Sequence, residues 1–325
     1  MVEILPFAAL RPSFEDAADV ASLPYDVMNR QEALEMAEEN PKSFLRIVRS
    51  EIELPGVDAY DNKVYQKARE NLLRFEEEGI LKQDERPHLY VYSLTMDGRT
   101  QRGLVALTSV DEYLEGSIKK HEFTREEKEI DRIKHFDTVN AHTEPVFLAY
   151  RRNERVKALL DEICKGEPTA NFTSEDGITH TCFIVDDEKE SELIRLFSEM
   201  EALYIADGHH RTASAAKVAE KRRRECTFCS GEEEFNFFLS VLFDEDELKI
   251  LDYNRVVKDL SGLSKEEFLR KVRETFDLKE QDSAVRPKEK GTFGMYLDGE
   301  WYLLTIKEEL LEGRSEERRV GKECR

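Results

Sequence analysis

The most chemically distinctive stretch of the chain is DGHHR at residues 207–211. The apolar residues 203–206 predict a short buried strand before it, and residues 212–224 predict a helix after it. Gly208 permits a backbone conformation that other residues avoid, so the chain can turn sharply there, and the helix should start near His209. The first N–H groups of a helix have no partners within it and lie at the positive end of its dipole. The sequence therefore predicts an anion site at this turn.

The side chains at the turn suit phosphate in particular. Arg211 has a planar guanidinium that can hold two phosphate oxygens, and the imidazoles and hydroxyls around it can donate hydrogen bonds or exchange protons. The alternative to phosphate binding is a structural role as a helix cap. Such a role explains a single histidine better than it explains DGHHR as a whole. We expect phosphate or nucleotide to contact Gly208, His209, His210, Arg211, Thr212 and Ser214.

A second group of reactive side chains lies in HEFTREEKEIDR, residues 121–132. Thr124 and Glu127 have the spacing of a capping box, which predicts a helix over 124–139 and leaves His121 and Glu122 on the loop before it. A loop carboxylate at a helix start can accept a proton or hold Mg²⁺. We therefore predict Glu122, Asp207 and His210 as the catalytic residues, with Mg²⁺ bound through Glu122 or Asp207.

Further candidates for substrate binding are His121, Lys128, Arg132, Asp26, Asn254 and Arg255. Lys128 and Arg132 are four residues apart and share a helix face, where they could grip phosphate or form the ion pairs of a solvated helix. Asp26 lies in LPYDV and could equally cap a turn. Asn254 and Arg255 follow an expected strand at 248–251, and a structural turn is as good an interpretation of them.

Composition excludes several classes of protein. The chain has 325 residues, 40% of them hydrophobic, and a net charge of −21, which disfavours nucleic-acid partners because binding to phosphate backbones depends on Lys and Arg. The basic run 221–224 suits the negative end of a helix. No apolar run is long enough to span a membrane, residues 1–10 lack a signal-peptide pattern, and five scattered cysteines fit the cytoplasm. Cys226 and Cys229 form a lone CxxC, a weak signal for zinc or redox chemistry.

Strand and helix patterns alternate irregularly, which indicates an α+β or mixed α/β fold. Asp97-Gly98 and Asp298-Gly299 predict hairpin turns, the second within a hairpin over 295–306. Ser264 and Glu267 form another capping box. The expected strands lie at 4–10, 89–95, 100–109, 145–150, 178–185, 203–206, 235–243 and 248–251, and the expected helices at 30–39, 58–79, 124–139, 212–224 and 264–276.

DGHHR after a strand resembles the signature of the ParB/sulfiredoxin-like superfamily, whose members bind nucleotide phosphates at this turn. By this motif the chain is similar to the free L-serine kinases, which phosphorylate serine with ADP or ATP. Nearly the whole chain also resembles a widespread prokaryotic family known only as a domain of unknown function. The stretches that carry this resemblance are LPYDV, NPKSFLRIVR, HEFTREEKEIDR, EPVFLAY, IADGHHRTASA and LDYNRVVKDL.

The resemblance implies a ParB/sulfiredoxin-like core over residues 1–262, with an inserted α/β subdomain at about 58–195. A C-terminal α/β segment over 263–313 follows. Residues 314–325, RSEERRVGKECR, have no pattern of their own, and we expect them to be a non-native tail after a truncated C-terminal segment.

Residues and resemblance together predict a cytoplasmic kinase that uses ATP or ADP with Mg²⁺ and phosphorylates a small-molecule hydroxyl, foremost that of free L-serine. The sequence leaves open whether the chain is a monomer or a homodimer. Three alternatives remain: a ParB-type nucleotide-binding switch, a phosphohydrolase such as a phosphoserine phosphatase, and a nuclease, which the charge makes the weakest. Sulfiredoxin chemistry needs a cysteine in the turn, where His209 and His210 stand.

Overall fold

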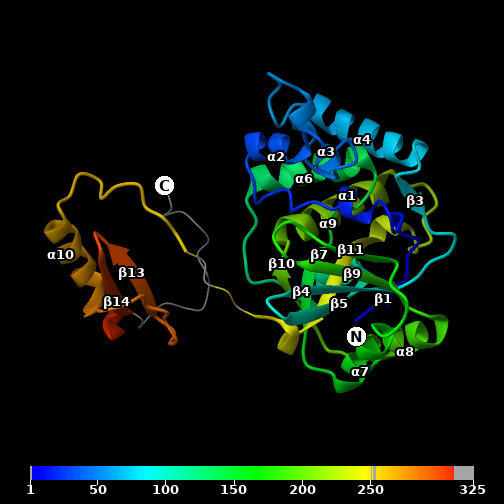
Figure 1. Ribbon diagram of the computed structural model, residues 1–325. Helices are drawn as coiled ribbons and strands as arrows, with labels where there is room; N and C mark the ends of the chain where they lie inside the picture. The colour runs from blue at the N-terminus through cyan, green and yellow to red at the C-terminus, as the bar shows by residue number, and fades with distance from the viewer. Residues whose placement is uncertain (1, 250, 252–253, 311–325) are drawn as a thin grey trace. The chain divides into compact units, whose positions relative to one another are not determined.

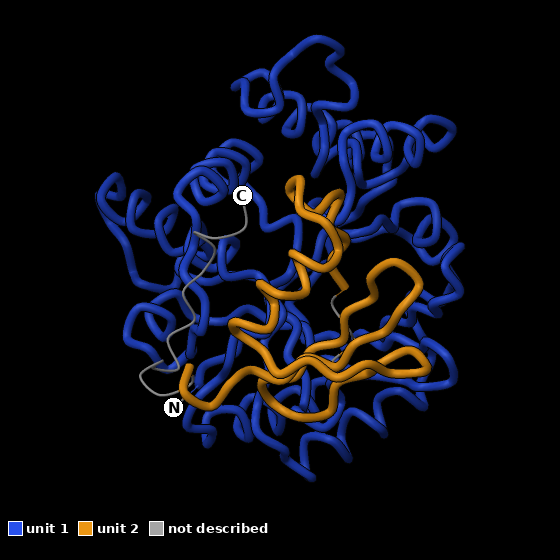
Figure 2. Tube along the Cα trace, turned by 90° about the vertical axis from the view of Figure 1, so that its left-hand side faces the viewer, with its two compact units in different colours: residues 1–249 blue, residues 250–325 orange. Residues whose placement is uncertain are grey.

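A computed structural model describes residues 2–249, 251 and 254–310 of the chain. These residues belong to two compact units, residues 1–249 and residues 250–325, which Figure 2 distinguishes by colour. The division lies before the boundary expected at 262. Residues of the expected insertion, 58–195, belong to the first unit and supply strands to its main sheet.

The first unit is built on a mixed sheet of nine strands (Figure 1). Eight of them follow the order β6-β10-β7-β11-β5-β4-β9-β8, and β1 pairs with β5. The β10/β6 and β11/β7 pairs are parallel, and the other pairs are antiparallel. The strands are β1 (Ile4–Leu5), β4 (Tyr90–Met96), β5 (Arg99–Ser109), β6 (Ile118–Lys119), β7 (Val146–Tyr150), β8 (Ala170–Thr173), β9 (Thr179–Ile184), β10 (Leu203–Asp207) and β11 (Phe237–Asp244).

Helices cover this sheet, and two of them, α6 and α9, carry several of the functional candidates. The α9 helix lies on one side of the sheet, whereas α7 and α8 lie on the other (Figure 1). Outside α9, α6 packs on α9 and α4 packs on α6. The helices of the first unit are α1 (Ala17–Val20), α2 (Arg30–Ala37), α3 (Leu45–Val48), α4 (Asn62–Glu77), α5 (Val110–Glu115), α6 (Glu126–Val139), α7 (Glu154–Ile163), α8 (Asp187–Ser198) and α9 (His209–Glu225).

Local patterns predicted several of these elements correctly. Asp97 and Gly98 have φ angles of 51° and 74°, the left-handed conformation that a two-residue turn between β4 and β5 requires. Along α4, Val64, Ala68 and Leu72 are buried at spacings of four, because one face of the helix packs on α3 and α6. The mixed α+β fold class is confirmed.

The second unit contains α10 (Lys265–Thr275) and a three-stranded antiparallel sheet of order β12-β14-β13. Its strands are β12 (Phe276–Gln281), β13 (Thr292–Leu297) and β14 (Glu300–Ile306). The expected capping box is present: the Ser264 side chain accepts from the Glu267 N–H and the Glu267 carboxylate accepts from the Ser264 N–H. A small core of Leu269, Tyr302 and Leu304 joins the helix to the sheet.

Three sequence predictions were wrong. The strand expected at 4–10 is divided between β1 and β2 (Leu10–Pro12), which pairs with β3 (Leu81–Gln83), because Pro6 lacks the N–H needed to continue the ladder. No strand forms at the described residues 248, 249 and 251. The helix expected from Thr124 begins at Glu126, and the Thr124 hydroxyl donates to Glu129 at 2.6 Å instead of capping. The sequence patterns also missed α5, α7 and α8.

Among the described residues, no helix combines the length and the apolar character needed to cross a bilayer. The expected tail at 314–325 lies outside the described residues.

Candidate functional site

The turn between β10 and α9 has the conformation that the sequence predicts. Gly208 has a φ of 97°, which side-chain-bearing residues rarely adopt, and α9 begins at the next residue. A Cβ on Gly208 would lie 3.2 Å from Nε of Arg211, which folds back beneath the turn. Glycine is therefore required here both for backbone conformation and for space.

Arg211 holds this turn against the neighbouring strand. Its Nη1 donates to the Pro145 carbonyl at 2.5 Å and its Nη2 to Oδ2 of Asp207 at 2.5 Å. The side chain is only 10% exposed, whereas that of Asp207 is 68% exposed. Both terminal nitrogens of the guanidinium thus have protein acceptors, and in this arrangement Arg211 positions the turn.

The two hydroxyls expected to contact phosphate are fully buried. Thr212 donates to the Gly208 carbonyl at 3.0 Å, and Ser214 donates to the Glu129 carbonyl at 3.1 Å. They fasten the first turn of α9 to the loop before it and to α6. This burial gives Thr212 and Ser214 a structural task.

The two adjacent imidazoles meet the loop before α6. Nε2 of His210 accepts a 3.0 Å hydrogen bond from the Arg125 N–H, and Nε2 of His209 faces the His121 N–H at 3.4 Å. On its other side, Nδ1 of His209 lies 3.8 Å from Oε2 of Glu122. The structure therefore brings together His209 and His210 with His121 and Glu122, two segments that the sequence separates by more than 80 positions.

Burial is the main influence on both imidazoles of the turn. It lowers the pKa of His209, with His121 adding to the effect and Glu122 opposing it. Burial likewise lowers the pKa of His210, against the opposing charges of Glu122 and Glu129. The site therefore presents neutral imidazoles near pH 7.

The start of α9 keeps its hydrogen-bond donors free. Gly208 has no side chain with which to cap the helix, and within the described residues the N–H groups of His209, His210 and Arg211 have no protein acceptor. Arg125, at the start of α6, also provides no side-chain cap. The starts of α6 and α9 lie side by side, because the two helices run parallel from the Arg125–His210 contact to the Lys221–Asp137 pair. The first turn of α6 carries Glu126, Glu127 and Glu129, whereas that of α9 carries no acidic residue, so the start of α9 is the one attractive to an anion.

A polar cavity of about 200 Å³ lies further along α6. Three of the predicted substrate residues, Asp26, Lys128 and Arg132, line it. Sequence reasoning missed several others, although three of them, Tyr25, Val48 and Arg49, lie in the LPYDV and NPKSFLRIVR stretches. The other lining residues are Tyr25, Met28, Val48, Arg49, Ser50, Glu51, Ala59, Tyr60, Val64, Tyr65, Asp131 and His135.

Arg132 is the most constrained charge in the cavity wall. Its guanidinium stacks on Tyr25 at 4.1 Å and pairs with Asp131 at 2.8 Å, and its side chain is 5% exposed. Within the described residues its Nη1 has no hydrogen-bond partner, and Oε2 of Glu144 is 4.0 Å away, also without one. A buried guanidinium with an unused donor is a natural contact for a bound carboxylate or phosphate.

The groups around Arg132 have strongly shifted pKa values because they are buried. Burial raises the pKa of Tyr25 to about 12, partly offset by Arg132, and burial raises the pKa of Glu144. Burial lowers the pKa of His135 to about 3. Glu144 also accepts the Tyr25 N–H at 3.1 Å, which ties the cavity wall to the strand that Arg211 binds.

A family model described as "Protein of unknown function (DUF1015)" matches residues 4–322. The chain belongs to this family. No curated protein and no solved structure matches it. Five of the six stretches that carry the resemblance supply residues to the turn or the cavity. The sixth, 251–260, lies in the second unit: Asn254 and Arg255 are exposed there, and residues 252 and 253 lie outside the described residues.

A second, larger hollow of about 330 Å³ lies between α3 and α4 in this family member. Its charged residues are already paired: Arg46 donates to Glu53 at 2.6 Å, and Lys67 lies 3.5 Å from the same carboxylate. Arg74 pairs with Glu78 at 3.5 Å. It contains none of the predicted site residues. The smaller cavity on α6 is therefore the better candidate for a binding site.

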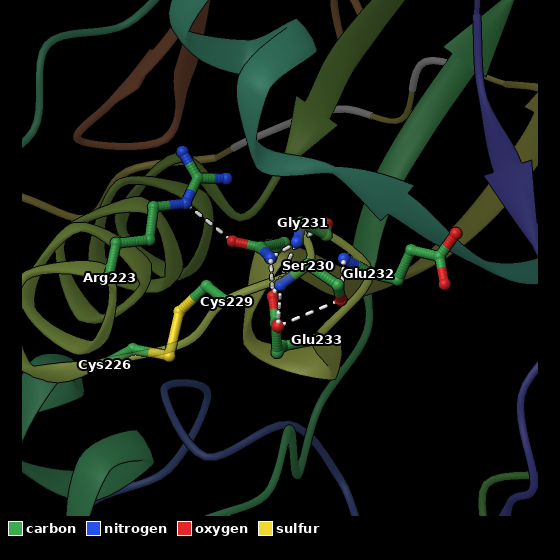
Figure 3. The surroundings of a disulfide bond; sticks show 8 residues. Arg223, Cys226, Cys229, Ser230, Gly231, Glu232 and Glu233 are labelled. Carbon is green, nitrogen blue, oxygen red and sulfur yellow. Dashed lines mark hydrogen bonds between the residues drawn. A yellow bond between two sulfur atoms is a disulfide. The ribbon is translucent and has the colours of Figure 1, made fainter.

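The basic end of α9 is a structural feature, as the sequence suggested. Lys221 and Arg222 bind Asp137, and Arg223 binds Asp111. Just beyond, Cys226 and Cys229 are joined by a disulfide, and Glu233 binds the N–H groups of Ser230 and Gly231 (Figure 3). Asn236 accepts from Nε of Arg223 at 2.6 Å, which fastens this loop to the end of α9 and not to the turn at Gly208.

Proposed function

We propose that this chain is a nucleotide-dependent phosphotransferase that phosphorylates a small-molecule hydroxyl, with free L-serine as the first acceptor to test. The observation that carries the proposal is the uncapped start of α9, whose free N–H groups lie beside His209, His210 and Glu122. Phosphoryl transfer depends mainly on positioning and charge stabilisation, and such a site offers both.

The phosphate donor, ATP or ADP, would bind at the turn. The N–H groups of His209, His210 and Arg211 would hold phosphate oxygens, with His210 as the partly accessible imidazole beside them. Asp207 or Glu122 would hold the Mg²⁺ that accompanies the nucleotide, and the ion would neutralise charge on the phosphates. Arg211, Thr212 and Ser214 would contribute by holding the turn in shape.

The acceptor would occupy the cavity on α6. Arg132 and Lys128 suit a carboxylate, and the exposed Asp26 suits an ammonium group, so the walls match the two charges of an amino acid. Glu122 or Asp207 would orient the acceptor hydroxyl and take its proton. Because α6 carries Lys128 and Arg132 and begins where His210 binds the Arg125 N–H, one rigid element connects the two half-sites.

The resemblance of DGHHR to the ParB/sulfiredoxin-like superfamily supports the same conclusion, because its free L-serine kinases share this motif. This resemblance is carried by DGHHR alone, and experiment must identify the acceptor.

The direct test is to incubate the full chain with isotopically labelled ATP or ADP, Mg²⁺ and a panel of amino and hydroxy acids, and to detect products by mass spectrometry. We expect His210→Ala to lower kcat by roughly 10²–10³, the usual cost of losing one preorganised donor. His180→Ala is the matched control, because His180 is also half-buried but lies on β9 beside Tyr92.

Two other outcomes would replace the proposal. Nucleotide binding without any phosphorylated product would indicate a ParB-type switch. Release of phosphate from phosphoserine without a nucleotide would indicate a phosphohydrolase. An unchanged rate in His210→Ala would remove the turn from the mechanism.

A further inference from the structure

Three side chains of the kinds that bind metal ions meet beside the α9 turn. His121, Glu122 and His209 each place one ligand atom within 4.8 Å of the other two. The centroids of the His121 and His209 rings are 4.5 Å apart, and the ring planes are nearly perpendicular, at 87°. In the part of the chain that the structure describes, no other three His, Cys, Asp or Glu side chains converge in this way.

The three residues differ in how firmly they are held. His209 is 5% exposed and fixed at the first position of α9. Glu122 is 40% exposed, and it and the exposed His121 lie on the loop before α6. Zinc binds nitrogen and oxygen ligands at about 2.0–2.2 Å, so these atoms must approach one another by a small shift, which the loop side chains are free to make.

We propose that His121, Glu122 and His209 bind a divalent transition-metal ion of the Zn²⁺, Co²⁺ or Mn²⁺ kind. Two nitrogens and one carboxylate oxygen favour such an ion over Mg²⁺, which prefers oxygen ligands and keeps several waters. Three protein ligands leave at least one coordination position for water or for an oxygen of a bound anion.

The location gives the ion a function. His209 is both a ligand and the first residue of α9, so an anion bound by the free N–H groups of that helix would lie next to the metal. A metal ion at this point would polarise a phosphoryl or carboxylate oxygen. The metal site itself does not depend on phosphate transfer, and it can be tested without any nucleotide.

The test uses the full chain, stripped of metal with a chelator and then titrated with Co²⁺ in the presence of excess Mg²⁺. We expect one Co²⁺ per chain, visible by its d–d absorption and by calorimetry, and displaced by Zn²⁺. His121→Ala and Glu122→Gln should each weaken binding by at least about 100-fold, since even the loss of outer-shell partners costs 10- to 100-fold.

The controls separate this site from others on the chain. Glu127→Gln removes an exposed carboxylate from the first turn of α6 and should leave Co²⁺ affinity unchanged. Sulfur-to-cobalt charge-transfer absorption would reveal binding at a cysteine thiolate instead, which Cys226 and Cys229 offer only after their disulfide is reduced. His209→Ala is the third ligand variant, to be read only where circular dichroism matches the wild type.

The outcomes for the metal and for the kinase are distinct. If the chain binds no Co²⁺ in the presence of Mg²⁺, or if both loop variants bind it as the wild type does, the metal site is refuted while phosphate transfer with Mg²⁺ stays testable. If Co²⁺ binds through these residues and no acceptor is phosphorylated, the metal site stands and the kinase proposal fails.

Discussion

The helix starts of this protein are of two kinds. In α10, the Ser264 hydroxyl accepts from the Glu267 N–H, and Asn29, Asp61, Asn153 and Asp186 provide similar caps for α2, α4, α7 and α8. In α9, Gly208 offers no side chain, and in α6, Arg125 makes no cap. Among the described helices of eight or more residues, α6 and α9 therefore stand apart.

The difference between the two kinds lies in whether a side chain of the protein accepts a hydrogen bond from the first N–H groups of the helix. A capped start satisfies its free N–H groups internally, which stabilises the helix by about 1 kcal/mol. The starts of α6 and α9 lack this stabilisation, and they meet at the only described cluster in which three His and Glu side chains bring ligand atoms within 4.8 Å of one another. The other long helices gain stability from their caps, and the proposed binding site lies at the two helix starts that have none.

The largest expected effect comes from closing the uncapped turn with Gly208→Ala. The left-handed conformation costs a side-chain-bearing residue about 1–2 kcal/mol, and the new Cβ would also press on Arg211, so we expect a total loss of about 2–3 kcal/mol in the free energy of unfolding. Urea denaturation would measure it. Gly177→Ala is the control: its φ is 81° with open space around it, so it should lose about 1 kcal/mol. Equal losses would show that Arg211 does not crowd the turn.

Acid should weaken the packing of α6 through His135, which is buried beside Asp131 and Arg132 with its Nε2 3.2 Å from the Ile47 carbonyl. Burial lowers its pKa to about 3 in the fold, below the ordinary 6.5 of histidine, so the unfolded chain takes up a proton first as pH falls. The contribution of His135 to the free energy of unfolding is therefore fully present well above pH 6.5 and decreases as the pH falls below it. We expect a loss of about 2 kcal/mol between pH 8 and pH 5.

The variant His135→Gln checks this assignment. It should remove that part of the pH dependence, as measured by denaturation at a series of pH values. A pH profile parallel to that of the wild type would mean that other groups cause the acid sensitivity.

A smaller effect is expected at the capped end of the comparison. Ser264→Ala removes the hydroxyl that accepts the Glu267 N–H and should destabilise α10 by about 1 kcal/mol. Amide hydrogen exchange at residues 265–267 would report the loss locally. Ser264→Gly should cost only a few tenths of that amount by the same reasoning, and an effect as large as that of alanine would contradict a capping role.

The smallest effect separates the expected cap of α6 from the observed contact. The Thr124 hydroxyl donates to Glu129 and not to a helix N–H, so Thr124→Ala should cost about 0.5 kcal/mol, the net value of one partly exposed hydrogen bond. Glu127→Ala should change stability less than this, because the capping box is absent. Equal losses of stability in the two variants would indicate that Thr124 and Glu127 do form a capping box.

Elements that depend on neighbours in sequence were predictable. The Asp97-Gly98 turn, the Ser264–Glu267 box and the buried face of α4 each need only residues within a few positions. Thr124 and Glu127 have the same spacing as Ser264 and Glu267, yet no box forms, because Arg125 is extended, with its N–H bound to His210, and the helix begins only at Glu126. A long-range contact overrode the local pattern.

The candidate site was predictable only in part for the same reason. Sequence reasoning selected His209, His210, Glu122 and Arg132, but it gave Arg211 to a ligand where the structure gives it to Pro145 and Asp207. It also overlooked Tyr25 and Glu144 as partners of Arg132, since stacking and burial leave no local signal.

The sequence by itself determined the strand, the glycine turn and the uncapped helix start at residues 203–225, because backbone conformation and helix capping are local properties of the chain. Only the tertiary structure decided which donors stay free there. Arg211, Ser214 and His210 bind the protein here because the Pro145 and Glu129 carbonyls and the Arg125 N–H lie within hydrogen-bond distance of them. Packing of segments far apart in sequence brings these partners together.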